Sequence, residues 1–154
     1  MTGQSDADGV TGGCARCGPA YLELLALSYN APERQPHHQL LVDSYSVQHP
    51  GGEDPVATQR LSICLMTLYL FLERGADPQH GPQLHRRMVH RARFTRLEPH
   101  PSAQDLHKKL TAADVAAADA TEYGKQLRAW AGDVWDAWRE HHAQVRAWTD
   151  ASLS

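Results

Sequence analysis

The sequence predicts an all-α protein, a small helical bundle with an N-terminal Cys-x-x-Cys knuckle packed on it. Three observations support this fold class. Apolar residues recur every three or four positions over several segments, which is the spacing of one face of an α-helix. No segment shows the alternation of apolar and polar residues that is typical of a strand. Prolines and glycines stand between the periodic segments, where they end one helix or begin the next.

Length and composition predict one domain behind a short leader. A chain of 154 residues is long enough to bury roughly two thirds of its unfolded surface. Residues 1–12 contain little to bury and are expected to be a disordered leader, and residues 13–150 are expected to form a single helical domain. The formal net charge of −3 gives no basic field for nucleic acid, so we expect no nucleic-acid partner.

The sequence predicts a cytoplasmic protein without a membrane partner. It has no apolar stretch long enough to span a bilayer, and its N-terminus lacks the basic and apolar regions of a signal peptide. In a reducing compartment we expect the three cysteines to be metal ligands or redox thiols in preference to forming a structural disulfide.

The first structured element is expected at the motif Cys14-Ala-Arg-Cys17-Gly18. Two residues between thiolates let both sulfurs reach one tetrahedral ion, and the following glycine admits a tight turn. Pro19 then begins a helix that is expected to end near Tyr29. The knuckle is therefore predicted to be attached directly to a helix.

The central helix is expected between His37 and the turn at Pro50. At helical spacing one face carries His38, Val42, Tyr45 and His49, with Asp43 on its flank. A buried imidazole needs partners for its ring nitrogens, so a core-facing stripe with a histidine at each end indicates a site.

The next two helices differ in polarity. Residues 56–74 are expected to form the longest apolar helix, closed by Gly75, with Cys64 on its inward stripe as a ligand or as a small buried hydrophobe. A shorter helix over residues 83–94 carries His85 and His90, which are expected to be solvated. Residues 95–104 contain two prolines and are expected to be extended.

The C-terminal part is predicted to be helical. Thr111-Ala-Ala-Asp114 is a variant of the capping box and begins a short helix. A last long helix is expected over residues 122–149, with either His141 or His142 pointing inward. Its four tryptophans are more typical of a core, but they could also line a pocket for a small molecule.

One Cys-x-x-Cys with histidines on two other helices matches the donors that hold zinc or another divalent transition metal. A redox motif of the thioredoxin type needs a strand before it, and the sequence supplies none. Asp43 and Tyr45 are the candidates for proton transfer at the metal. The candidate metal ligands are Cys14, Cys17, His38, His49, Cys64, His141 and His142.

Five motifs resemble an uncharacterised bacterial domain-of-unknown-function family, and together they cover nearly everything after residue 13. They are CxxCG, HxLxVDxYxxQHPG (38–51), LYLxLExG (68–75), LEP with TxxDV, and WAxxVWxAWxxHHxxVRxW (130–148). The resemblance implies that one pattern includes Cys14, Cys17, His38, Asp43, Tyr45, His49 and the pair His141 and His142. In that pattern a histidine commonly stands at the position of Cys64.

Two function classes follow from these residues. In the first, a metal with an open coordination position activates water or polarises a small polar substrate, as in a metalloenzyme. In the alternative, four protein ligands close the tetrahedron, and a structural zinc site supports a ligand-binding or interaction module. The number of protein ligands at the metal distinguishes the two classes.

Overall fold

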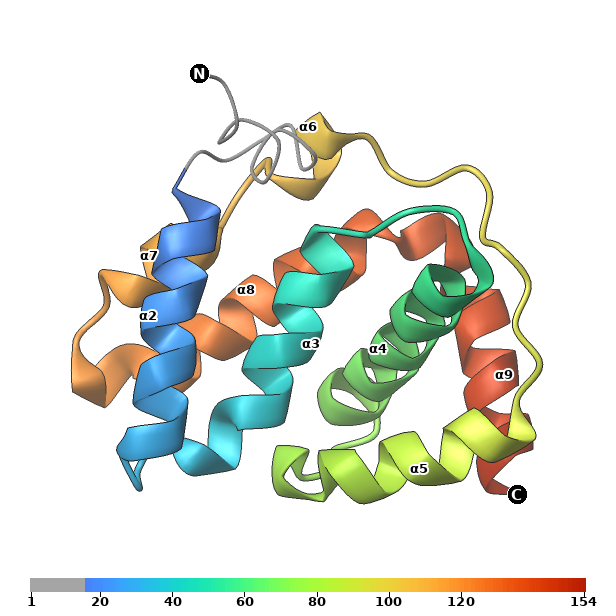
Figure 1. The fold of residues 1–154 in the computed structure, drawn as a ribbon, viewed down its shortest axis with the longest axis horizontal. Helices are drawn as coiled ribbons and strands as arrows, with labels where there is room; N and C mark the ends of the chain where they lie inside the picture. The colour runs from blue at the N-terminus through green and yellow to red at the C-terminus, as the bar shows by residue number, and fades with distance from the viewer. Residues whose placement is uncertain (1–15) are drawn as a thin grey trace.

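The computed structural model describes residues 16–154, so the expected leader and Cys14 lie outside the described residues. Over the described part the chain is all-α, which confirms the predicted fold class, and it contains no strand. Figure 1 shows the helices packed as a small bundle. Their bounds are α2 Cys17–Asn30, α3 His38–Gln48, α4 Pro55–Glu73, α5 Gly81–Arg91, α6 Ala103–Leu106, α7 Ala112–Ala116, α8 Tyr123–Ala137 and α9 His142–Leu153.

The helix ends follow local sequence signals. The Asp54 side chain accepts a hydrogen bond from the Ala57 backbone N–H at 2.9 Å, and Pro55 occupies the first helical position of α4. Gly75 ends this helix with φ of 71°, a left-handed conformation that glycine adopts without a steric penalty. Thr111 and Asp114 form the predicted capping box of α7.

α4 is the core helix of the bundle. Every residue from 61 to 71 is buried, and α4 packs against α3, α5, α8 and α9. Within the described residues it is also the one helix long and apolar enough to cross a membrane, with 61% of that stretch buried inside the fold. This extensive burial is that of a core helix of a helical bundle.

The prediction of one continuous C-terminal helix was wrong, because α8 and α9 are separated by a bend at residues 138–141. There the backbone N–H groups of Trp138 and His141 bond to carbonyls three residues back instead of four. The His142 ring donates from Nε2 to the Trp135 carbonyl oxygen at 2.8 Å. The bend lets α8 pack on α3 while α9 packs on α4 and α5.

Three tryptophans of the C-terminal part, Trp130, Trp135 and Trp138, belong to the core. Trp138 is fully buried and donates its indole N–H to the Val47 carbonyl oxygen at 3.2 Å. Trp130 is also fully buried. A small-molecule pocket lined by tryptophans stays a prediction.

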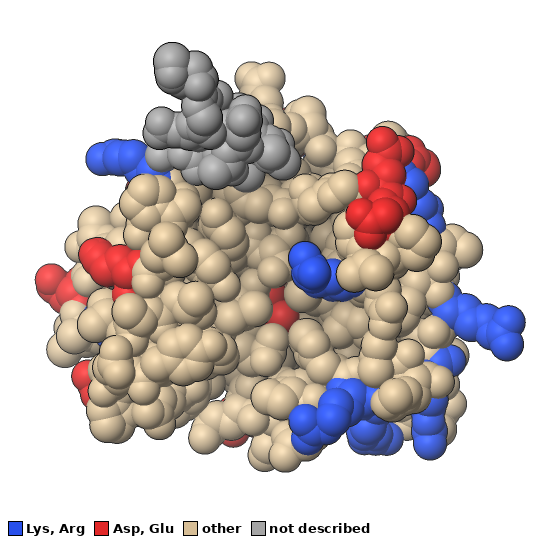
Figure 2. Space-filling view, in the orientation of Figure 1, with Lys and Arg blue, Asp and Glu red and all other residues tan. Residues whose placement is uncertain are grey.

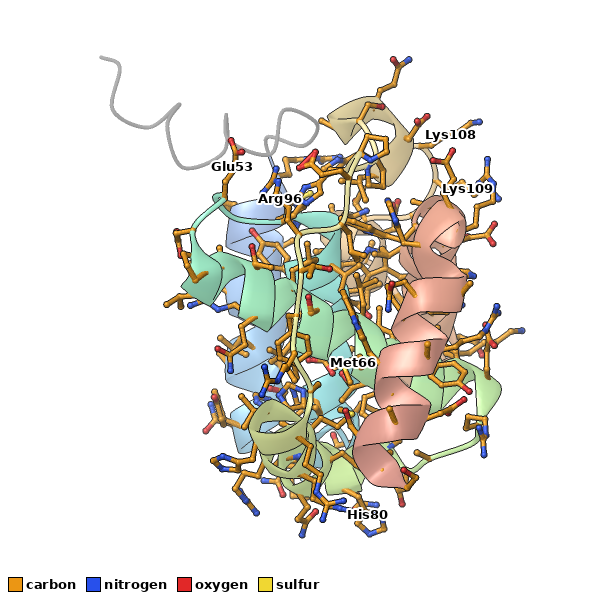
Figure 3. The ribbon with its side chains drawn as sticks, turned by 90° about the vertical axis from the view of Figure 1, so that its right-hand side faces the viewer. Glu53, Met66, His80, Arg96, Lys108 and Lys109 are labelled. Atoms are coloured by element: carbon orange, nitrogen blue, oxygen red, sulfur yellow. The ribbon has the colours of Figure 1, made fainter. Side chains whose placement is uncertain are left out.

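The non-helical segment between α5 and α6 crosses one side of the bundle. Figure 3 shows Arg96 of this segment beside Glu53, which precedes α4, and the two form an ion pair at 3.5 Å. α6 then begins at Ala103, where the Ser102 hydroxyl accepts a hydrogen bond from the Asp105 backbone N–H. The segment thus brings a short capped helix to the end of the bundle where α2 begins and α3 ends (Figure 1).

Candidate metal centre

Three potential metal ligands lie together at this end of the bundle. One ligand atom each from Cys17, His49 and His107 falls within 4.8 Å of the others. Cys17 is disulfide-bonded in this structure, contrary to the expectation of a thiol, so the group could hold a metal ion through the Cys17 thiolate only after reduction. Cys17 is the first residue of α2, and His49 and His107 directly follow the last residues of α3 and α6. Helix ends therefore bring together three side chains that are far apart in the sequence.

Backbone carbonyls fix the tautomers of both histidines. His49 Nδ1 lies 3.0 Å from the Tyr45 carbonyl oxygen, and His107 Nδ1 lies 2.9 Å from the Ala103 carbonyl oxygen. A carbonyl oxygen can only accept, so each Nδ1 carries the proton. In the neutral rings, each Nε2 then carries a lone pair.

These two Nε2 atoms lie 3.1 Å apart. At that distance their lone pairs repel unless a proton or a cation lies between them. Two nitrogens bound to one tetrahedral zinc at 2.0–2.1 Å are about 3.3 Å apart, close to the separation seen here. Metal-bound histidines commonly donate their other ring N–H to a carbonyl, as both histidines do in this structure.

Gln48 holds the two histidine-bearing segments in place. Its fully buried side chain donates from Nε2 to the carbonyl oxygens of Leu106, at 2.8 Å, and Leu110, at 3.0 Å. Its Oε1 accepts the indole N–H of Trp130 at 3.0 Å. Gln48 precedes His49, and the two carbonyls bracket His107, so one amide fixes both ligand positions.

Aromatic rings pack against the His49 side of the group. Tyr45 stacks on Tyr21 with ring centroids 3.8 Å apart, and the His49 ring lies 4.1 Å from the Tyr45 ring. Burial, and then the neighbouring Tyr45, raises the pKa of Tyr21 to about 12. Tyr21 therefore keeps its proton at neutral pH and is unsuited to act as a general base.

The other predicted histidine ligands lie elsewhere. His38 Nδ1 lies 2.8 Å from the Ser28 hydroxyl. His141 donates from Nε2 to the Pro99 carbonyl oxygen at 2.7 Å, and His142 stacks on Trp135 with centroids 3.7 Å apart. Among the described residues, the structure brings Cys17 and His49 together but places these three histidines outside the group.

Sequence reasoning missed His107. Residues 95–104 were expected to be extended, and no element was predicted for residues 105–110. A usable signal was present, because Ser102 has the type and spacing of an N-cap for a helical turn that places His107 directly after apolar Leu106. Such a four-residue helix is too short for apolar periodicity to reveal it.

Asp43 and Cys64 belong to a different cluster, between α3, α4 and α5. Asp43 is fully buried and accepts hydrogen bonds from Thr67 Oγ1 at 2.6 Å and Gln39 Nε2 at 2.9 Å. The ring nitrogen His85 Nε2 lies 3.4 Å from its carboxylate. The expectation of a solvated His85 was therefore wrong, whereas His90 is exposed as expected.

Cys64 contributes its thiol to the cluster around Asp43. Burial, followed by the charge of Asp43 and a hydrogen bond to it, raises the pKa of the Cys64 thiol. Cys64 is therefore a neutral thiol in this state and lies outside the group of potential metal ligands. The two predicted proton-transfer residues lie in different places. Asp43 is part of this cluster, whereas Tyr45 packs against His49.

Comparison with known protein families identifies a family for this chain. The model of a family of unknown function, DUF5946, matches residues 7–139. The chain belongs to DUF5946. The match confirms the predicted resemblance to an uncharacterised family and covers all three residues of the metal-ligand group in this DUF5946 chain. Neither a curated protein nor a solved structure matches the chain.

Proposed function

We propose that this DUF5946 chain is a zinc-binding protein in which Cys14, Cys17, His49 and His107 hold one ion. The observation that carries the proposal is the pair of Nε2 atoms 3.1 Å apart, each in a ring whose Nδ1 is already committed to a carbonyl. The proposal applies to the reduced protein, because Cys17 is disulfide-bonded in this structure. Once reduced, its thiolate is a soft donor within reach of two imidazoles, which favours zinc over magnesium or calcium, since these ions prefer oxygen ligands.

Cys14 is proposed as the fourth ligand because it precedes Cys17 by the spacing of a zinc knuckle. Two thiolates and two imidazoles close a tetrahedron, which is the arrangement of structural zinc sites. The ion would then attach the start of α2 to the ends of α3 and α6. Thiolate ligands persist in a reducing environment, so a cytoplasmic location is part of this proposal.

A metalloenzyme is the alternative. The described residues contribute three ligands, and three protein ligands with a water molecule in the fourth position are typical of catalytic zinc. In that case the metal would activate the water for attack on a small polar molecule. The alternative requires that Cys14 does not bind the ion.

Metal content tests the proposal. We expect the purified protein to contain about one zinc per chain, as four protein ligands provide for a single ion. His107→Ala should lose the metal, whereas His100→Ala, a control in the preceding segment, should retain it. If His107→Ala keeps the full zinc content, the group described here is not the site.

A Cys14→Ala variant separates the two function classes. Under the structural proposal, the cobalt-substituted variant loses one of two thiolate charge-transfer contributions, and its zinc affinity falls sharply. Unchanged affinity and an unchanged cobalt spectrum would instead favour the open, catalytic site.

A further inference from the structure

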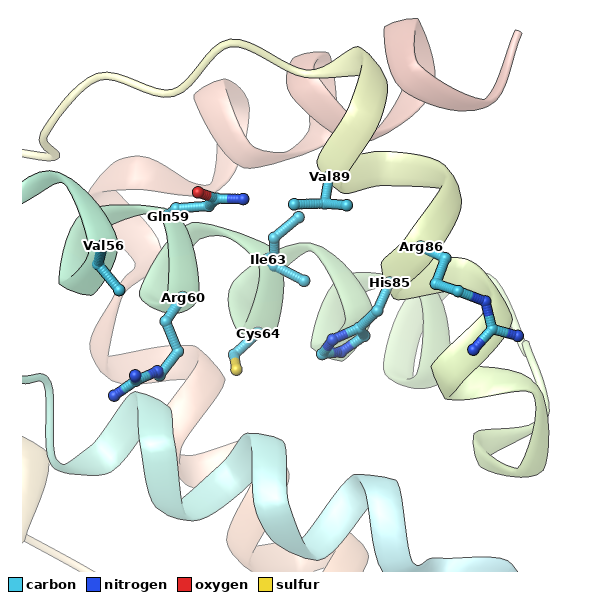
Figure 4. A pocket seen from close by; sticks show the side chains of 8 residues that line it. All are labelled: Val56, Gln59, Arg60, Ile63, Cys64, His85, Arg86 and Val89. Carbon is cyan, nitrogen blue, oxygen red and sulfur yellow. The ribbon is translucent and has the colours of Figure 1, made fainter.

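A pocket separate from the metal-ligand group opens between α4 and α5. It has a volume of about 370 Å³ and is lined by Val56, Gln59, Arg60, Ile63, Cys64, His85, Arg86 and Val89 (Figure 4). None of the three metal-ligand residues lines it. Pockets of a few hundred cubic ångströms have the size that small organic ligands occupy.

The walls of this pocket are largely apolar. Ile63 on α4 and Val89 on α5 lie close to each other in Figure 4. Val56, at the start of α4, is 65% exposed, which is unusual for a valine and leaves an apolar surface at the mouth. A ligand with an apolar body would remove this surface from water.

The charged residues that line the pocket are cationic. Arg60 extends on the same side of α4 as Cys64 and His85, and Arg86 adds a second guanidinium. No aspartate or glutamate lines the pocket, and α5 contains none. Figure 2 shows Lys and Arg side chains gathered over α5. An anionic group would therefore be attracted to the part of the surface formed by Arg60 and α5.

The polar part of the pocket wall is held by side-chain contacts. His85 faces Asp43, whose carboxylate is held by Thr67 and Gln39. Gly81 lets the start of α5 approach α3, because a Cβ there would overlap the Gln39 side chain. An imidazole positioned by a buried carboxylate is a fixed hydrogen-bonding group, and this arrangement is prepared before any ligand arrives.

We propose that this pocket binds a small amphipathic anion. Its apolar body lies against Val56, Ile63 and Val89, its anionic group pairs with Arg60, and the ligand contacts the ring of His85. A carboxylate and a phosphate monoester share this chemistry. The site is independent of the metal-ligand group, so it would stand even if the zinc proposal failed.

Titration with three matched six-carbon probes tests the proposal. Hexanoate and hexyl phosphate are anionic, and hexanamide is a neutral analogue of hexanoate. We expect at least one anion to bind about tenfold more tightly than hexanamide, since charge-assisted hydrogen bonds are roughly twice as strong as neutral ones. Binding should shift the ring proton resonances of His85. Equal affinities for all three probes, or His85 ring proton resonances that do not shift on binding, would overturn the proposal.

Two arginine variants test the position of the anionic group. Arg60→Gln should weaken binding of the preferred anion about tenfold while leaving hexanamide unaffected. Arg87→Gln is the control, because this exposed arginine follows Arg86 on α5 but does not line the pocket. Equal losses in both variants would indicate nonspecific attraction to the basic helix and would contradict the assigned site. Both substitutions are at exposed positions and should leave the fold intact.

Discussion

Replacing Gln48 by methionine should destabilise the fold and weaken the metal site together. Methionine has nearly the volume of glutamine, so the change leaves little cavity but removes three hydrogen bonds in a fully buried position. The Trp130 indole N–H and the carbonyls of Leu106 and Leu110 would then lack these partners. A buried polar group left unpaired costs about 1–3 kcal/mol, so we expect the three groups together to cost about 3–9 kcal/mol.

A loss of that size is large for a domain of this length. The free energy of unfolding of such domains is about 5–15 kcal/mol, so Gln48→Met should remove about a fifth of it or more. Because the same amide fixes the segments on both sides of His107, zinc affinity should fall as well. Loss of a group that supports metal ligands typically weakens metal binding about 10- to 100-fold.

Urea unfolding of the chelator-treated protein, followed by tryptophan fluorescence and circular dichroism, measures the first effect. Competition with a chromophoric zinc chelator measures the second. Gln104→Met is the control, because Gln104 is exposed on α6. A loss below about 1 kcal/mol, comparable to one ordinary hydrogen bond, would refute the reasoning. Unchanged zinc affinity in an otherwise destabilised variant would refute the link to the metal site.

Two further predictions concern titratable groups outside the proposed metal ligands. Burial lowers the pKa of His142 below its ordinary value of 6.5, so the unfolded chain binds a proton at higher pH than the native protein does. Stability should therefore fall as pH drops below about 6.5, and His142→Gln should flatten this fall in urea titrations from pH 7.5 to 5; an identical slope in the variant would contradict it. Asp43→Asn should cost about 2 kcal/mol, because the amide is a weaker acceptor for Thr67 and Gln39. Thermal unfolding at pH 7 checks this value against the exposed control Asp119→Asn, and equal midpoints for the two variants would show that the buried cluster contributes little.

Periodicity and capping signals were enough to predict most of the fold. The helical spacing of apolar residues over the segment 56–74 indicates α4, and its ends are marked by Asp54, Pro55 and Gly75. The bend before α9 could not be predicted from apolar periodicity or capping signals. A short 3₁₀ turn keeps the apolar spacing nearly in step, so residues on both sides still appear to share one face.

The candidate site was harder to predict than the fold. Sequence spacing identified Cys17, and the polar end of the central helix identified His49. The partner of His49 depends on a contact between residues 58 positions apart, and no local pattern encodes it. His107 was not a candidate, whereas His141 and His142 were chosen because they lie among the apolar residues of the last predicted helix. Their partners, the Pro99 and Trp135 carbonyls, become apparent only in three dimensions.

The positions of the three ligands along the chain have a consequence for folding kinetics. Cys17 and His49 are 32 positions apart, and His49 and His107 are 58 positions apart. An ion bound by all three would act as a removable cross-link that closes two long loops at once. Since the ligands meet only after helices from three parts of the chain have docked, the ion would enter late in folding. It would then chiefly slow unfolding, and chelation of the folded protein would shorten the lifetime of the native state while leaving the rate of refolding nearly unchanged.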